Sequence, residues 1–455
     1  MCQLCENNHI IGTKYVIMEL PRKVLQDLNK WKDDPDRKPL ILQGARQVGK
    51  TWLLKKFGSI RFANTAYFNF DQQNELKQFF QVTKDPKRIL ENLSLVSGKA
   101  ILPHSTLIIF DEIQECKEAL NALKYFCEDA PEYAVVCAGS LLGVAMKRGA
   151  SFPVGKVDFI KIFPLTFSEF LEAAEPVLFA YLNSLERVEP IPDIFYNQLK
   201  DKLKLFFITG GMPESVASFL DHKDVGKVQT ILLNILNSYT LDFSKHIDNK
   251  DIAKINHVWG SLPSQLAREN KKFLYQTIRV GARAREYEDA ITWLINAGLY
   301  YKTYCSTKPG LPLSAYDDLS AFKIYFLDTG LLRRLSLLDP SAIAEGNRLL
   351  TEFKGALTEN YVLNSLIQQF EGMPKYWKSG NEAEVDFIFQ YQNQVIPVEV
   401  KSDENSRSKS LTVYRKSFKP EISIKYSLLN LRRDQDLINI PLFLADFTYN
   451  ILKKI

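Results

Sequence analysis

The chain has 455 residues, enough for two to four domains that each bury a core of their own. Hydrophobic residues make up 46% and charged residues 24%, and the formal net charge is +5, which is ordinary for a globular protein and permits nucleic-acid binding without requiring it. No apolar run reaches the roughly 20 residues that span a bilayer, so we expect no membrane association.

The first 17 residues are expected to form an N-terminal extension, with ordered structure beginning near Met18. Cys2 and Cys5 form a C-x-x-C pair followed by His9, but a structural zinc site needs four ligands and no second pair lies nearby. The six cysteines are scattered along the chain, which is typical of reduced thiols in a cytoplasmic protein rather than of a disulfide framework. No secretory signal pattern opens the sequence.

The strongest chemical pattern is GARQVGKT at residues 44–51, which satisfies G-x-x-x-x-G-K-[ST]. It lies between an expected strand (Leu40–Leu42) and an expected helix (Trp52–Phe57), the context in which this pattern binds phosphate. Its glycines let the backbone approach an anion, which the loop N–H groups and the helix N-terminus then face together. Lys50 is expected to reach the β- and γ-phosphates, and Thr51 to ligate Mg²⁺. The predicted ATP-binding residues are Gly44, Ala45, Arg46, Gln47, Val48, Gly49, Lys50, Thr51 and Trp52.

Two later strands are expected to supply the residues for hydrolysis. TLIIFDEIQ at residues 106–114 has four apolar residues, as in a parallel strand buried on both faces, before Asp111 and Glu112. Asp111 is predicted to hold the Mg²⁺ shell, and Glu112 to orient and deprotonate the attacking water. After the next strand, Tyr133–Ala138, Ser140 is a candidate for contact with the γ-phosphate or the water. Serine is also a favourable helix N-cap, and both roles can hold at once.

Residues 18–167 are predicted to form a doubly wound α/β domain, a P-loop NTPase with a parallel sheet. The expected strands fall near residues 40, 67, 108, 135 and 160 and are separated by helical stretches. In such a sheet the nucleotide lies at the carboxyl ends of the strands. Residues 168–249 are helical in pattern and are expected to form a lid.

Residues 250–345 are predicted to form a winged-helix-like domain, because two helices (Ile255–Glu269 and Gly281–Asn296) precede two β-like segments. The second helix begins with Arg283 and Arg285. These arginines either touch a nucleic-acid backbone or are simply solvated, and the sequence favours neither alternative.

A second chemical pattern lies in the C-terminal part, where a hairpin is expected over residues 384–401. Glu399 and Lys401 are two residues apart and project to one face of their strand, and Asp386 can lie alongside on the neighbouring strand. With Glu359 on an upstream helix, these carboxylates are predicted to hold Mg²⁺, while Lys401 orients a water or stabilises phosphate charge. The alternative is a half-exposed hairpin with an ordinary Glu–Lys pair, because E-x-K alone is common.

These motifs in combination resemble one large prokaryotic ATPase family. They are GARQVGKT, IIFDEIQ, GGMPE, AREYEDAITWLINAGL, FKIYFLDTGLL, GALTENYV and the pair AEVDFIF–IPVEVKS. The resemblance implies an AAA-type ATPase, related to signal-transduction NTPases, with a restriction-endonuclease-like (PD-(D/E)XK) α/β domain of unknown function over residues 346–455. It implies nucleotide-site roles for Lys50, Thr51, Asp111, Glu112 and Ser140, and nuclease-superfamily positions for Glu359, Asp386, Glu399 and Lys401.

One segment departs from the family pattern. Relatives often carry arginines before the strand that enters FPLTF, whereas this chain has Arg148 and then Lys156. Lysine does not replace the planar fork of arginine. An arginine finger for a neighbouring subunit, and with it the formation of an oligomer, is therefore left open.

The predicted function is Mg²⁺-dependent binding and hydrolysis of ATP, coupled to a nuclease-like domain that acts on or docks to DNA. One alternative is an ATP-dependent switch that meets a protein partner and has a vestigial, non-cleaving C-terminal domain. Another is a DNA-binding ATPase without nuclease activity, whose affinity for DNA depends on salt.

Overall fold

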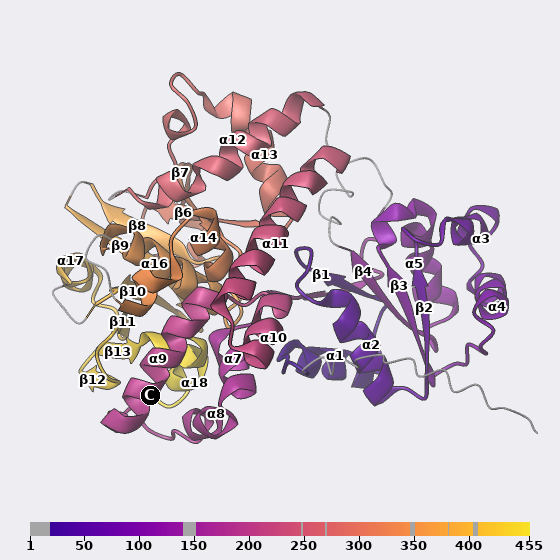
Figure 1. Ribbon diagram of the computed structural model, residues 1–455, viewed down its shortest axis with the longest axis horizontal. Coiled ribbons are helices and arrows are strands. Elements are labelled where there is room, and N and C mark those ends of the chain that lie inside the picture. The colour runs from indigo at the N-terminus through magenta and orange to yellow at the C-terminus, as the bar shows by residue number, and fades with distance from the viewer. Residues whose placement is uncertain are drawn as a thin grey trace, which may run out of the picture.

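The computed structural model describes residues 19–139, 152–246, 249–268, 271–345, 351–380, 382–403 and 408–455. Figure 1 shows a parallel sheet with its helices on the right, and a larger part built of helices and a second sheet on the left. The expected N-terminal extension, with Cys2, Cys5 and His9, lies outside the described residues, as do Ser140 and Arg148.

The first sheet confirms the parallel α/β fold predicted for the N-terminal region. Its five strands are all parallel, in the order β2-β3-β4-β1-β5. They are β1 (Leu40–Gln43), β2 (Asn64–Asn69), β3 (Thr106–Asp111), β4 (Ala134–Gly139) and β5 (Asp158–Lys161). Every residue of β3 and β4 is buried, as expected for central strands covered on both faces. The helices of this part are α1 (Val24–Asp33), α2 (Lys50–Arg61), α3 (Lys77–Val82), α4 (Pro86–Ser97) and α5 (Lys117–Asp129).

Local sequence explains several helix boundaries. The side chain of Asp85 accepts a hydrogen bond from the Lys87 amide at the start of α4, and Pro86 fills the first helical position. Gly98 ends the same helix with a φ of 62°, a left-handed conformation that favours glycine. Short 3₁₀ helices also occur, namely η1 (Asn74–Leu76), η2 (Ile113–Glu115), η4 (Tyr275–Thr277), η5 (Leu313–Tyr316) and η7 (Leu442–Phe447).

A run of helices leads from the first sheet into the larger part, in agreement with the helical pattern of residues 168–249. They are α7 (Phe167–Ala174), α8 (Pro176–Asn183), α9 (Asp193–Thr209), α10 (Pro213–His222) and α11 (Val225–His246). Then follow α12 (Asn249–Leu266) and α13 (Ala284–Asn296). Figure 1 places α11 beside the P-loop end of the first sheet, so this long helix lies where the two parts meet.

The second sheet has eight strands in the order β12-β13-β11-β10-β9-β8-β6-β7. They are β6 (Tyr300–Ser306), β7 (Asp317–Phe326), β8 (Lys375–Ser379), β9 (Ala383–Tyr391), β10 (Gln394–Val400), β11 (Ser423–Ser427), β12 (Arg432–Asp434) and β13 (Leu437–Pro441). The helices around it are α14 (Thr329–Leu335), α15 (Pro340–Glu345), α16 (Thr351–Leu366), α17 (Lys409–Phe418) and α18 (Thr448–Leu452).

This sheet crosses the boundary that the sequence analysis places at residue 345. The β6–β7 hairpin, expected in a separate winged-helix-like domain, joins β8 through two parallel pairs, Cys305↔Tyr376 and Ser306↔Trp377. The sequence carries no local signal for so short a junction between distant segments. A hydrophobic cluster continues from β1 through α7–α13 to the second sheet, and another lies under α3–α5.

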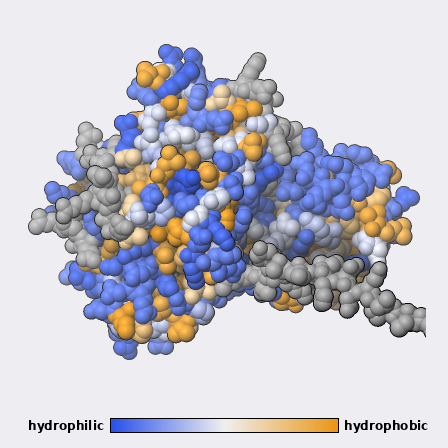
Figure 2. Space-filling view, in the orientation of Figure 1, coloured by the Kyte–Doolittle hydropathy of each residue, from blue (hydrophilic) through white to orange (hydrophobic). Residues whose placement is uncertain are grey.

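The visible surface is mostly hydrophilic, with apolar residues in small groups (Figure 2). Within the described ranges, no helix combines the length and the apolar character needed to cross a bilayer.

Candidate nucleotide and carboxylate sites

The loop between β1 and α2 has the backbone that its glycines predict. Gly49 has a φ of 91° and Gln47 a φ of 63°, so two residues of the loop are left-handed. A Cβ atom on Gly44 would lie 2.4 Å from the carbonyl oxygen of Ile162, which leaves room for glycine alone. No side chain caps the N-terminus of α2, so its first N–H groups stay available to an anion.

Lys50 is the first residue of α2 and is buried. Its Nζ donates to the carbonyl oxygens of Gly44, at 2.9 Å, and Ala45, at 2.7 Å. Burial lowers the pKa of Lys50 to about 8, against the opposing effect of the Glu112 and Asp111 carboxylates. A bound anion would therefore strongly stabilise the charged form of Lys50.

Thr51 and Asp111, the two residues predicted to hold Mg²⁺, are in contact. The hydroxyl of Thr51 donates to Oδ2 of Asp111 at 2.7 Å, joining the start of α2 to the end of β3. Hydroxyl and carboxylate oxygens are hard ligands of the kind that Mg²⁺ prefers, so this pair fits the ion. Tyr67, which the sequence analysis missed, donates to the same carboxylate oxygen at 2.8 Å. The parallel pairing of β2 with β3 could have pointed to it.

Glu112 follows β3 in a left-handed conformation, with φ 50° and ψ 47°. For a residue with a Cβ atom this conformation is unfavourable, by roughly 1–3 kcal/mol, and such residues concentrate at functional sites. The side chain of Gln114 donates to Oε2 of Glu112 at 2.5 Å. The strained turn aims the Glu112 carboxylate close enough to Lys50 to influence its pKa.

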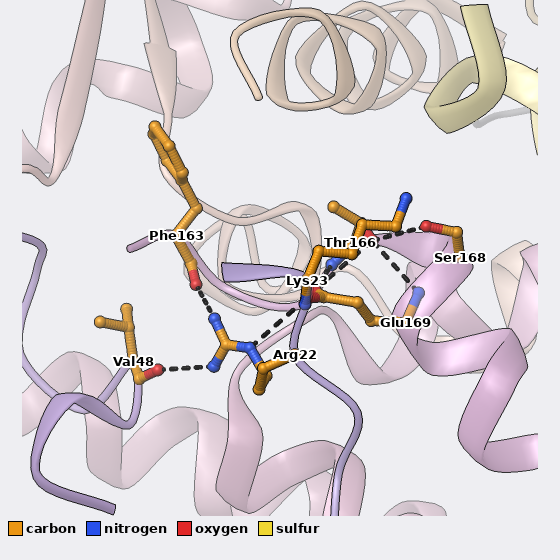
Figure 3. Close-up of polar contacts among 7 residues, drawn as sticks. All are labelled: Arg22, Lys23, Val48, Phe163, Thr166, Ser168 and Glu169. Atoms are coloured by element: carbon orange, nitrogen blue, oxygen red, sulfur yellow. Dashed lines mark hydrogen bonds and ion pairs between the residues drawn. The ribbon is translucent and has the colours of Figure 1, made fainter. Parts of the chain in front are cut away.

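Arg22, a second residue missed from the sequence, holds the P-loop through its guanidinium group (Figure 3). Its Nη1 donates to the Val48 carbonyl at 2.9 Å, and its Nη2 to the Phe163 carbonyl at 2.6 Å. Its Nε lies 3.6 Å from the Glu169 carboxylate, which also accepts from the Lys23 amide at 2.7 Å. The segment before α1 is therefore bound both to the P-loop and to the start of α7.

The second part of the molecule contacts the tip of the P-loop. Arg46 forms an ion pair with Asp242 of α11 at 2.8 Å, and Tyr239 of the same helix donates to the Arg46 carbonyl at 2.8 Å. A Cβ atom on Gly298, between α13 and β6, would lie 3.3 Å from the Ala45 amide nitrogen. A change in the conformation of the loop would therefore directly alter its contacts with α11.

A cavity of about 690 Å³ opens between the two parts. On one side its lining includes Gly44 of the P-loop and Gly139 at the end of β4, and on the other Gly298 and Tyr301. The cavity thus lies at the carboxyl edge of the parallel sheet, the expected position of a ligand in this fold.

In the C-terminal part, the hairpin of β9 and β10 brings Asp386 and Glu399 to neighbouring positions, as predicted. Oδ2 of Asp386 accepts from the Val400 amide at 2.7 Å, and Nζ of Lys401 lies 2.6 Å from Oε1 of Glu399. The other oxygen of Glu399 is buried and has no hydrogen-bond partner among the described residues. Burial, followed by the Glu359 and Glu399 charges, raises the pKa of Asp386 well above its usual range.

Glu359 of α16 completes the predicted group, but a lysine from the middle segment already engages it. Lys271 forms an ion pair with its carboxylate, and Tyr325 of β7 donates to it at 3.3 Å. Burial alone would raise the pKa of Glu359, but Lys271 and Lys323 hold it below the usual value. A further carboxylate, Glu384, lies 2.6 Å from Nζ of Lys323.

This arrangement does not fit a Mg²⁺ ion as it stands. Within the described part of the chain, no group of three or more His, Cys, Asp or Glu side chains is placed to hold a metal. Glu359, predicted as an oxygen ligand, is instead paired with Lys271. The carboxylates do not fit a Mg²⁺ ion because two lysines, distant in sequence, already supply the positive charge that they require. No local pattern in the sequence could predict these pairings.

Other predicted features have more ordinary surroundings. Lys156, which stands where relatives carry arginine, pairs with Glu128 of its own chain at 2.8 Å. Arg283 and Arg285 are exposed at the start of α13. Their exposure is compatible with either nucleic-acid contact or solvation, and both remain predictions.

Family comparisons assign the N-terminal region. Residues 36–171 match the model of an AAA domain, so this part of the chain is an AAA-type P-loop ATPase domain. Two further segments match domains of unknown function, DUF8612 over residues 200–342 and DUF4143 over residues 354–443. None of the curated proteins matches the chain.

Three solved structures are similar in part. A Walker-type ATPase of Pyrococcus abyssi is 15% identical, covering 69% of this chain and 95% of its own, with a TM-score of 0.43. The Orc1 protein of Aeropyrum pernix, solved in complex with DNA, is 13% identical and covers 71% and 94%, with a TM-score of 0.30. The RuvB Holliday junction branch migration motor of Thermotoga maritima is 12% identical and covers 62% and 90%, with a TM-score of 0.30. Because every TM-score is below 0.5, no property of these proteins is transferred to this chain.

Proposed function

We propose that this chain binds ATP with Mg²⁺ and hydrolyses it at the carboxyl edge of its parallel sheet. The observation that carries the proposal is the 2.7 Å hydrogen bond between Thr51 and Asp111 beside the buried ammonium group of Lys50. These three side chains come from the P-loop helix and a neighbouring strand, and their chemistry suits a metal-bound triphosphate.

Each residue would act on a different part of the substrate. The loop N–H groups and Lys50 would bind the phosphates and stabilise negative charge that develops during transfer. Thr51 and Asp111 would hold Mg²⁺, whose positive charge would offset the negative charge of the phosphates. Glu112 would accept a proton from the attacking water, in the role of a general base.

The decisive test replaces the proposed base. We expect Glu112→Gln to lower the rate of ATP hydrolysis by about 10²–10⁴-fold, the usual contribution of a general base, while ATP still binds. Phosphate release and retention of labelled ATP, measured on the same sample, separate the two effects. Glu118→Gln, an exposed position on α5, is the matched control and should hydrolyse ATP at the parental rate. An unchanged rate in Glu112→Gln would show that this carboxylate is not the base.

We further propose that nucleotide state reaches the larger part of the molecule through α11. The ion pair of Arg46 with Asp242 and the hydrogen bond from Tyr239 support this route, because both start at the P-loop tip. Asp242→Asn should alter the response of the second part to ATP, read as the protease cleavage pattern with and without nucleotide. An identical response in the variant and the parent would remove α11 from the route.

The C-terminal region has two candidate roles. A nuclease with a restriction-endonuclease-like core is supported by the common location of Asp386, Glu399 and Lys401 on one hairpin. A nucleotide-driven switch with a non-cleaving scaffold is favoured by the pairing of Glu359 with Lys271, which leaves no three-carboxylate set for a cation in the described residues.

Incubation with Mg²⁺ or Mn²⁺ and supercoiled, linear or branched DNA separates the two roles. Cleavage that disappears in Asp386→Ala would establish the nuclease. Intact DNA in every form, with ATP hydrolysis preserved, would establish the non-cleaving switch, whose partner is then a protein or an uncut nucleic acid.

A further inference from the structure

Two lysines from outside the C-terminal hairpin pair with carboxylates of the C-terminal site. Lys271 lies in the segment after α12 and pairs with Glu359, while Lys323 lies on β7 and approaches Glu384 to 2.6 Å. Lys323 is 1% exposed, and its Nζ also lies 4.7 Å from the ring centre of Tyr376. Both ammonium groups are therefore held inside the protein at carboxylates rather than in solvent.

Side chains of β7 and β9 are in contact, although β6 and β8 lie between these two strands in the sheet order. Two residue pairs connect β6 to β8, whereas the β6–β7 and β8–β9 pairings are longer. The ring centre of Tyr325 on β7 lies 5.6 Å from that of Phe387 on β9. Lys323 and Tyr325 alternate to the same face of β7, so both point toward the carboxylates.

The same packing fixes Lys271. The Phe273 amide donates to the Phe322 carbonyl of β7 at 2.8 Å, and the rings of these two residues stack 5.2 Å apart. Leu274 exchanges two backbone hydrogen bonds with the side chain of Gln265 on α12. Both lysines consequently belong to one packed unit of α12, residues 271–274 and β7.

The charges around the site favour this closed arrangement. Four carboxylates (Glu359, Glu384, Asp386 and Glu399) face three lysines (Lys271, Lys323 and Lys401), which gives a formal net charge of −1. Without Lys271 and Lys323 the formal net charge would be −3, and such a charge attracts a divalent cation strongly. The unpartnered buried oxygen of Glu399 supplies one ligand atom that such a cation would meet.

We propose that Lys271 and Lys323 exclude divalent cations from the C-terminal carboxylates, so that the middle segment keeps this site closed. This inference rests on the C-terminal part of the proposed function and adds its regulation. Withdrawal of the packed unit would remove two positive charges together and open the site to Mg²⁺ or Mn²⁺. The unit also touches the ATPase part, because Trp259 of α12 packs against Tyr239, the partner of the Arg46 carbonyl.

The test is Mn²⁺ binding to the full chain without nucleotide, measured by electron paramagnetic resonance of the free ion. We expect the double variant Lys271→Met, Lys323→Met to bind Mn²⁺ at least tenfold more tightly than the parent. Adding Asp386→Asn should abolish that gain, which assigns the ion to this site. The control Lys302→Met removes a charge from β6 that stacks on Tyr304 and Phe322, and should leave Mn²⁺ affinity unchanged.

Two results would overturn the inference. One is a folded double variant that binds Mn²⁺ no better than the parent, and the other is a parent that already shows tight, Asp386-dependent binding. If the double variant does not fold, Lys271→Met alone decides, because the Lys271 side chain is 13% exposed and its loss opens the edge of the site. ATP hydrolysis and DNA cleavage, measured on the same samples, distinguish failure of this inference from failure of the proposed function. Mn²⁺ binding without DNA cleavage would refute the nuclease and leave intact the exclusion of cations by the two lysines.

Discussion

The P-loop site and the C-terminal carboxylate site contain similar side chains in opposite arrangements. At the P-loop, Lys50 donates to backbone carbonyls, and Asp111 accepts from the hydroxyls of Thr51 and Tyr67. At the C-terminal site, lysines pair directly with carboxylates, as Lys401 does with Glu399. The first site keeps its charges available for a ligand, whereas the second neutralises most of them internally.

Acidic residues next to a lysine therefore do not by themselves define a functional site. A buried ion pair contributes little net stability, but the loss of one partner is costly because it leaves an uncompensated charge. The carboxylates of the C-terminal site therefore depend on their lysines for stability, and the P-loop residues depend less on one another.

Breaking the internal pairing should give the largest effect on stability. Glu359→Leu leaves Lys271 without its partner, and we expect the free energy of unfolding to fall by about 3–5 kcal/mol. Thr51→Val, the counterpart at the P-loop, removes one hydrogen bond and should cost about 1 kcal/mol. Urea unfolding of both variants checks the comparison, and equal losses would contradict it.

Removing the lysine from each site should affect ATP turnover very differently. Lys50→Ala should lower hydrolysis by roughly 100-fold or more, because the phosphates lose their buried counter-charge. Lys401→Ala should leave the rate within about twofold, since its partner Glu399 lies in the other sheet. A phosphate-release assay measures both. A large loss in Lys401→Ala would mean that the C-terminal site controls turnover.

The pKa of Lys50 predicts a moderate pH dependence of ATP binding. Because burial lowers this pKa to about 8, the side chain is charged below that pH and increasingly neutral above it. The charged form binds phosphate, so affinity should fall as pH rises, by about fivefold between pH 8 and pH 9. Titration with a fluorescent ATP analogue measures this change. Lys50→Met should lack it, and a parent with constant affinity would refute the role of the charge.

The smallest effect is expected for charges that face solvent. If Arg283 and Arg285 contact nucleic acid, replacing them by alanine should weaken DNA binding. Each replacement should also lower the slope of log affinity against log salt concentration by about one phosphate contact. Fluorescence anisotropy over a range of salt concentrations measures both quantities. Arg187→Ala, with its side chain 80% exposed, is the control. An unchanged salt dependence would leave the two arginines as solvated residues.

Much of the ATPase fold could be predicted from sequence because its signals are local. Apolar runs such as TLIIF mark strands buried on both faces, and GARQVGKT places glycines where the loop requires left-handed or closely packed backbone. The observed boundaries differ slightly from the expected ones, since α2 begins at Lys50 rather than Trp52. In the C-terminal region the sequence predicts the β9–β10 hairpin but gives no signal for β8 and β11–β13.

The sequence alone was sufficient to identify the phosphate-binding loop, the acidic end of β3 and the hairpin with Asp386 and Glu399, since each is encoded within a few adjacent residues. Tertiary structure alone decided that Arg22 holds the P-loop, that Tyr67 meets Asp111, and that β6 joins β8. It also decided that Lys271 reaches Glu359, 88 residues away along the chain. The physical reason is that long-range pairing depends on how sheets curve and pack, and no periodicity or motif records which distant charges will meet.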